Sequence, residues 1–239
     1  YDGSGNGNHG TISGATYVNG VGAPVAQSAV IDWNKGANLL TYSEDFTEWT
    51  LEGSASLTSN ATTAPSGESN ASKLIAGASS ARQSIKLNVT KSGDLVYSVY
   101  AKKGEYDVVQ FTDARDPNLY ANFDLTNGVV GDSDVATPSI ENIGDGWYRC
   151  SVSYNAANDI ISVRISIAES PTSARLVNFA GNGSDGIYIW GASLEEATAI
   201  GSYVETIGTA QTTPVLLPQG LTTGRDITGV NLFENVRKQ

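Results

Sequence analysis

The residues that most often carry enzyme chemistry are scarce in this sequence. The chain of 239 residues has one histidine, His9, and one cysteine, Cys150. A Ser-His-Asp or Cys-His mechanism needs the histidine beside the nucleophile, but His9 lies in a Gly-rich stretch and Cys150 on the apolar face of an expected strand. A zinc site needs three or four Cys, His or carboxylate ligands. We therefore expect neither centre, and we expect Cys150 to be a small buried apolar side chain.

Pairs of carboxylates are the remaining route to catalysis, through acid–base chemistry of the glycosidase type. The candidate pairs are Asp113 with Asp116 and Asp132 with Asp134. Aspartates at such short spacing more often hydrogen-bond their own backbone in turns. No group of residues in the sequence meets the requirements for an active site, so we expect no catalytic residue and no enzyme activity.

Side chains that suit sugar binding are easier to find. A sugar has an apolar face and a rim of hydroxyls, so an aromatic ring beside amide or guanidinium groups is a suitable platform. Trp147 and Tyr188 are expected to point outward, but a Trp beside a Gly turn often packs under a loop. The alternative for every candidate is solvated strand surface or cover by a loop. The predicted ligand-binding residues are Tyr100, Gln110, Tyr120, Asn122, Arg149 and Arg164.

These candidates lie on segments with the two-residue period of half-buried strands. Residues 147–154 place Tyr148, Cys150, Val152 and Tyr154 on one face, and residues 161–167 place Ile161, Val163, Ile165 and Ile167 on one face. The polar residues 155–159 predict a hairpin loop between them. Residues 186–196 form a third strand, and residues 95–102, apolar on both faces, predict a mid-sheet strand.

Further strands are expected at 83–89, 106–111, 120–125 and 175–179, with Asn127-Gly128 as a tight turn. Turn signals recur about every 8–12 residues across some nine strands, which is typical of an antiparallel sandwich. No segment keeps a helical apolar period over three turns. The predicted fold class is therefore all-β, an antiparallel two-sheet β-sandwich.

The composition supports this fold and excludes some partners. Charged residues make up 16% of the chain, glycine occurs 26 times, and the net charge is −11. Such acidity would repel nucleic acid, and no apolar run is long enough to insert into a membrane. The chain contains no methionine, so we expect it to be a processed product or a piece of a longer polypeptide.

Four motifs occur in the order typical of one group of proteins. They are Asn38-Leu-Leu-Thr-Tyr-Ser-Glu-Asp-Phe with Trp49, Tyr97-Ser-Val-Tyr-Ala-Lys-Lys-Gly104, Gly146-Trp-Tyr-Arg149, and Ile187-Tyr-Ile-Trp-Gly-Ala-Ser-Leu-Glu195 with Tyr203. Together they resemble the jelly-roll domains of phage tail and virion structural proteins, which are related to carbohydrate-binding modules of families four and nine. The resemblance covers residues 37–206 and implies a jelly-roll sandwich in a virion or extracellular setting.

The resemblance also bears on calcium. Sugar-binding relatives often carry acidic residues after the Tyr-Ile of the last strand, where they help to hold a structural Ca²⁺. Here Trp190-Gly191 occupies that place, which argues against such an ion, although Asp185 and Glu195 lie nearby. The Asp/Asn/Gly run of residues 1–10 also has oxygen ligands suited to Ca²⁺, but tight turns are favoured there. We expect no cofactor.

The expected organisation has three parts. Residues 1–36 form a Gly-rich flank whose stretch 4–18 resembles the opening of laminin-G-like sandwich domains, residues 37–206 form the jelly roll, and residues 207–239 form a linker and C-terminal flank.

The expected function is that of a non-catalytic module of a phage or prophage virion. It would bind host-surface glycan or other virion proteins. The expectation includes both a monomer and a homo-oligomer of this chain. The alternatives are a carbohydrate-binding module of a secreted polysaccharide-degrading enzyme and a purely structural spacer.

Overall fold

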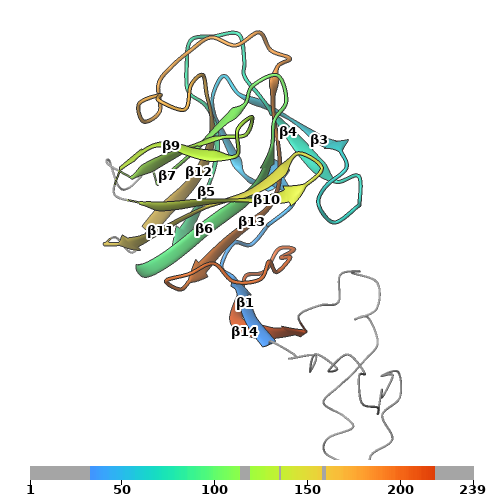
Figure 1. Cartoon of the computed structure of the whole chain (residues 1–239), viewed down its shortest axis with the longest axis vertical. Coiled ribbons are helices and arrows are strands. Elements are labelled where there is room, and N and C mark those ends of the chain that lie inside the picture. Colours follow the sequence, from blue (N-terminus) through green and yellow to red (C-terminus); the bar gives the residue numbers. More distant parts are fainter. Residues whose placement is uncertain (1–32, 114–118, 135, 158–159, 219–239) are drawn as a thin grey trace, which may run out of the picture.

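Two antiparallel sheets stack face to face and enclose the core (Figure 1). The computed structural model describes residues 33–113, 119–134, 136–157 and 160–218. The first sheet has the order β10-β11-β6-β13-β4-β3. Its strands are β3 (Ser56–Thr62), β4 (Ala71–Ile75), β6 (Gly93–Lys102), β10 (Thr137–Gly144), β11 (Trp147–Ala156) and β13 (Gly186–Glu196).

The second sheet has the order β2-β5-β12-β7-β8-β9. Its strands are β2 (Thr50–Gly53), β5 (Gln83–Thr90), β7 (Val108–Asp113), β8 (Tyr120–Asp124), β9 (Val129–Asp134) and β12 (Ile160–Ala168). A short 3₁₀ helix, η1 (Phe46–Glu48), precedes β2. The chain crosses repeatedly between the sheets, as in a jelly roll. The predicted fold class, an all-β antiparallel sandwich, is confirmed.

The core lies between the sheets because each long strand turns alternate apolar residues inward. Tyr97 of β6 packs against Phe111 of β7 with ring centroids 4.9 Å apart, and Phe111 packs against Phe123 of β8 at 5.0 Å. Of the residues predicted to be buried, Tyr148 is only half-buried against the core. The others are all buried: Cys150, Val152, Ile161, Val163, Ile165 and Ile167.

The predicted hairpin between residues 147–154 and 161–167 is wrong. β11 pairs with β6 and β10 in the first sheet, whereas β12 pairs with β5 and β7 in the second. The two strands therefore lie in different sheets, on opposite sides of the core. Alternation shows that a strand has one buried face, but it does not identify the neighbouring strand. A connection that crosses to the other sheet and a hairpin within one sheet therefore have the same sequence pattern.

Residues 175–179 do not form the predicted strand either. Leu176 has a φ of 53° in the left-handed region, where a bulky residue does not extend a strand. Only Phe179 pairs, through an isolated bridge to Ala81. The segment instead belongs to the long connection between β12 and β13, which lies over the second sheet.

A two-stranded ribbon forms a third, small sheet, and the end of its first strand contacts β13 (Figure 1). β1 (Trp33–Asn38) pairs antiparallel with β14 (Gln211–Pro218), so part of the expected linker pairs with the end of the N-terminal flank. His9 and the laminin-G-like stretch lie outside the described residues, as does the C-terminal end of the chain. Within the part of the chain that the structure describes, no helix is long and apolar enough to cross a membrane.

Candidate ligand-binding face

Aromatic side chains gather on the outer face of the first sheet. Alternation on β6, β11 and β13 turns the residues between the core positions outward, and the rings of Tyr100, Trp147, Tyr188 and Trp190 follow that pattern. They form a second apolar cluster, separate from the core, that also includes Tyr203 and two alanines. We call these five aromatic residues the aromatic face.

Part of the aromatic face is covered by the segment that follows β13. The Tyr203 ring lies 4.9 Å from Trp190 and 5.8 Å from Tyr100, measured between centroids. Its hydroxyl donates to Glu44 Oε1 at 2.9 Å, and Asn70 Nδ2 donates to Glu44 Oε2 at 2.7 Å. Burial raises the pKa of Glu44 above its ordinary value, although these hydrogen bonds oppose the shift. These bonds hold the segment against the sheet.

Arg149 belongs to the same cover and is not an outward-facing ligand contact as predicted. Arg149 is buried. Its Nη1 donates to Gly201 O at 2.8 Å, and its Nη2 donates to Ser98 Oγ at 3.3 Å. Its guanidinium lies 5.4 Å from the centre of the Tyr100 ring. Glu195 accepts from Gly201 N at 3.2 Å, and burial raises its pKa. Arg149 therefore ties the covering segment to the sheet, and Tyr100 stays half-buried beneath it.

A row of four residues lies beside this cover on the same face. Strand register places Lys73 of β4, Tyr188 of β13, Lys102 of β6 and Trp147 of β11 side by side across the sheet. Cross-strand neighbours on one face are close enough to interact. Lys73 Nζ lies 5.8 Å from the centre of the Tyr188 ring, and Lys102 Nζ lies 6.0 Å from the centre of the Trp147 ring. These are cation–π distances.

The ends of this row differ in exposure. Trp147 is buried, and its Nε1 donates to Thr63 O at 3.2 Å, which is the packing under a loop considered for it above. Tyr188, Lys73 and Lys102 are only half-buried. Lys73 pairs with Glu105 at 2.7 Å, and this hydrogen bond lowers the pKa of Glu105. Tyr188 with Lys73 and Lys102 on either side is the half-buried part of the face beside the cover, and we call it the Lys–Tyr–Lys row.

Two other predicted site residues, Gln110 and Asn122, hold a loop in place. Both are buried on the outer face of the second sheet. Gln110 Oε1 accepts from Leu176 N at 2.8 Å, and Asn122 Nδ2 donates to Ser173 O at 2.7 Å. The two side chains are also hydrogen-bonded to each other, since Gln110 Nε2 donates to Asn122 Oδ1 at 2.7 Å. They lie on the outer face as predicted, but the prediction that they are exposed ligand contacts is corrected, because the connection between β12 and β13 covers them.

Arg164 is also buried, and so is its neighbour Ser166, although sequence alternation placed both outside. Arg164 Nε donates to Glu52 Oε2 at 2.5 Å, and Lys86 pairs with Glu52 Oε1 at 2.7 Å. Burial alone would raise the pKa of Glu52, but the hydrogen bonds from Arg164 and Lys86 outweigh it and lower the pKa to about 2. Arg164 is thus half of a buried ion pair.

The six predicted site residues therefore do not form one site. Tyr100 and Arg149 lie on the first sheet, whereas Gln110, Asn122, Arg164 and the half-buried Tyr120 lie on the second. Sequence reasoning missed both lysines of the Lys–Tyr–Lys row. Lys102 shares the strand face of Tyr100, so alternation offered a signal for it. Lys73 is placed only by the pairing of β4 with β13.

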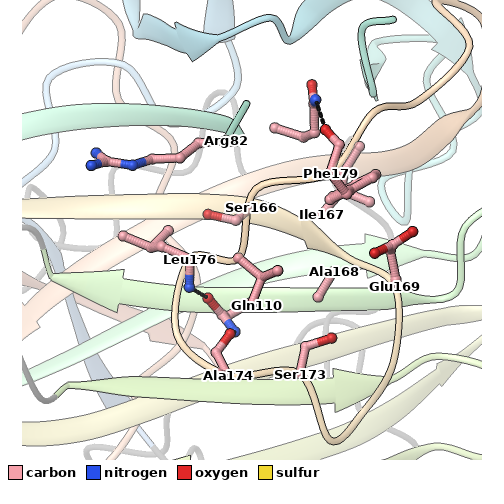
Figure 2. A pocket seen from close by; sticks show the side chains of 12 residues that line it. Arg82, Gln110, Ser166, Ile167, Ala168, Glu169, Ser173, Ala174, Leu176 and Phe179 are labelled. Atoms are coloured by element: carbon pink, nitrogen blue, oxygen red, sulfur yellow. Dashed lines mark hydrogen bonds between the residues drawn. The ribbon is translucent and has the colours of Figure 1, made fainter. Parts of the chain in front are cut away.

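Figure 2 shows a narrow pocket between the outer face of the second sheet and the loop above it. Gln110, Ser166 and Ser173 line it together with Arg82 and Glu169. Its polar side chains mostly form hydrogen bonds to the connection between β12 and β13, such as the one from Leu176 N to Gln110 Oε1 in Figure 2. Its free volume is about 10 Å³, roughly the room that one water needs. This pocket cannot hold a sugar ring.

The structure describes three of the four aspartates considered for catalysis. Asp113 is buried and accepts from Ser162 N at 2.9 Å, Asp132 and Asp134 are exposed on β9, and Asp116 lies outside the described residues. Cys150 is buried as predicted, and burial raises its pKa well above the ordinary value.

Asp185 and Glu195 lie at opposite ends of β13, so they cannot share one ion. The described residues contain no group of three or more His, Cys, Asp or Glu side chains that could hold a metal.

Comparison with known proteins finds similarity in structure but not in sequence. No protein-family model matches the chain, and no curated protein matches it in sequence. Among solved structures, the chain is similar to TmCBM61 in complex with beta-1,4-galactotriose, at 12% identity and a TM-score of 0.39. The match covers 68% of this chain and 100% of the other. A similarity at this level does not assign a ligand to this chain.

Proposed function

We propose that this chain is a non-catalytic glycan-binding module that presents the Lys–Tyr–Lys row as its binding surface. The observation that carries the proposal is the half-buried Tyr188 ring, held on a regular strand between Lys73 and Lys102. An aromatic ring stacks on the apolar face of a sugar, while neighbouring ammonium groups donate hydrogen bonds to its hydroxyls. A rigid strand also holds these groups in place before binding, which lowers the entropic cost.

The setting we propose for this module is a phage or prophage virion, in a tail fibre, spike or decoration protein. The resemblance of the four ordered motifs to virion jelly rolls supports that setting. A shallow platform orders few groups, so we expect a dissociation constant on the order of 0.1–1 mM per site. Several copies on one particle would raise the effective affinity by about 10²–10⁴-fold. The same surface would also serve a carbohydrate-binding module of a secreted polysaccharide-degrading enzyme.

A glycan array probed with the monomeric and the multimerised chain tests this proposal. We expect binding that is visible chiefly in the multimerised format. Absence of binding in both formats would remove the glycan-binding function and favour a structural spacer. Turnover of a bound glycan that Asp113→Ala or Asp116→Ala abolishes would contradict the non-catalytic assignment.

Replacing Tyr188 by Ala should weaken glycan binding at least tenfold, because the stacking surface is lost. Isothermal titration with the best array ligand measures the effect. Tyr120→Ala is the matched control, since Tyr120 is also a half-buried strand tyrosine but lies on the outer face of the other sheet. Equal loss of affinity in both variants, or no loss in Tyr188→Ala, would show that Tyr188 is not the platform.

A further inference from the structure

The Lys102 side chain is placed by the turn next to it. Gly146 has a φ of +79°, and a Cβ atom there would meet Lys102 Cε at 3.4 Å. The aliphatic stem of Lys102 therefore runs across the turn before β11, and its ammonium lies 6.0 Å from the centre of the Trp147 ring. Long cationic side chains often cover apolar surface in this way while the charge stays accessible.

Lys102 differs from its basic neighbours in having no acidic partner. Lys73 pairs with Glu105 at 2.7 Å. Arg149 lies 4.0 Å from Glu195 and also donates to Gly201 and Ser98. Among the described residues, Lys102 has neither an ion pair nor a hydrogen bond to a side chain. Its contact is the Trp147 ring, and the exposed Asp145 of the adjacent turn does not pair with it. Lys102 is thus a half-buried lysine whose ammonium has no acidic partner among the described residues, in a chain with a net charge of −11.

Tyr188 lies directly beside this ammonium in the strand register. A ring that stacks on a sugar and a cation one strand away suit a sugar that carries an anionic substituent. The ring accepts the apolar face, and the ammonium pairs with the carboxylate or sulfate at its edge. Lys73, whose charge Glu105 already balances, would supply hydrogen bonds to neutral hydroxyls.

We infer that the glycan bound at the Lys–Tyr–Lys row contains acidic sugars and that Lys102 is the residue that recognises their anionic group. This inference rests on the proposed function, because it names the chemical class of the ligand for the same surface. It also accounts for how a strongly acidic chain holds an acidic polymer. A cation in contact with the ligand is screened little, whereas exposed charges farther away than a Debye length of about 8–10 Å are largely screened.

The test compares acidic oligosaccharides with counterparts that lack the charge. Carboxylated sugars are paired with their methyl esters, and sulfated sugars with their desulfated forms, all measured against the multimerised chain. We expect the acidic member of a pair to bind more tightly and its binding to weaken as salt rises. Preference for carboxylated or for sulfated sugars distinguishes the two sources of charge. Equal binding of both members of every pair would overturn the inference but leave glycan binding intact, whereas no binding at all would overturn the proposed function.

Replacing Lys102 by Gln should lower the affinity for the acidic oligosaccharide about twofold to fivefold, as expected for a partly exposed ion pair. It should also flatten the salt dependence and leave binding of the uncharged counterpart unchanged. Lys102→Arg should retain the preference for acid. The matched control is Lys103→Gln, because Lys103 is the adjacent lysine and bonds Thr126 Oγ1 instead. If Lys102→Gln kept the full preference for acidic sugars, the inference would be wrong.

Discussion

Replacing Glu52 by Gln is expected to lower the free energy of unfolding by about 2–4 kcal/mol. Arg164 is 2% exposed, and the Glu52 carboxylate is its charged partner. Removing one member of a buried ion pair leaves the other charge desolvated and unpaired, which is much more destabilising than losing a surface pair. Since the Glu52 side chain is 15% exposed, water compensates part of this cost. Urea denaturation of the two proteins measures the difference.

The pH dependence provides a second measurement on the same pair. The folded-state pKa of Glu52 is about 2, below the ordinary value of 4.5. A carboxyl group with a lowered pKa stabilises the fold above its unfolded-state pKa, and this contribution is lost as the pH falls through the folded-state pKa. The stability difference between wild type and Glu52→Gln should therefore shrink between about pH 4.5 and pH 2.

Glu44 and Glu195, whose raised pKa values act in the opposite direction, are present in both proteins, so their effects cancel in this difference. Glu48→Gln is the control, because Glu48 is an exposed carboxylate in η1 without an ion pair among the described residues. It should change stability by less than about 0.5 kcal/mol. A Glu52→Gln variant as stable as this control would show that the Glu52–Arg164 ion pair does not contribute to the free energy of unfolding.

Replacing Ile165 by Ala is expected to lower the free energy of unfolding by about 2–5 kcal/mol. Ile165 lies on β12 between Ile85 of β5 and Phe111 of β7, and all three side chains are fully buried. The substitution removes buried methyl groups and leaves a cavity, since neighbours on two regular strands cannot move in to fill it. The midpoint of chemical denaturation should fall while its slope stays unchanged.

The matched control for this substitution is Ile207→Ala. Ile207 is 77% exposed, so the same deletion there removes little buried surface and should change stability by no more than about 0.5 kcal/mol. An unchanged denaturation midpoint in Ile165→Ala would contradict the placement of this residue in the core.

The sequence by itself determined the all-β class and which face of each strong strand is buried. Alternation is a local property, because successive side chains point to opposite faces whatever the neighbours of the strand are. The burial of Cys150, Val152, Ile165 and Ile167 therefore followed from their spacing alone. The glycine-flanked turn before Trp147 and the turn at Asn127-Gly128 followed from local turn chemistry in the same way.

The partner of each strand was decided only by the tertiary structure. Two alternating strands joined by a short polar loop are compatible with pairing in one sheet and with facing across a core, because both bury one face. β11 and β12 adopt the second arrangement, because β11 pairs in the first sheet and β12 in the second. That pairing depends on β6 and β5, whose paired residues lie 45 or more positions away in the sequence.

Tertiary structure also decided which polar residues face water. Gln110, Asn122 and Arg164 lie on the side that alternation assigns to solvent, yet a long loop or an ion pair buries them. Cover of this kind comes from segments distant in the chain and leaves no periodic signal. The Lys–Tyr–Lys row has the same origin, since residues 73, 102 and 188 become neighbours only through the order β6-β13-β4. Strand faces follow from local sequence, whereas a site assembled across strands depends on long-range pairing.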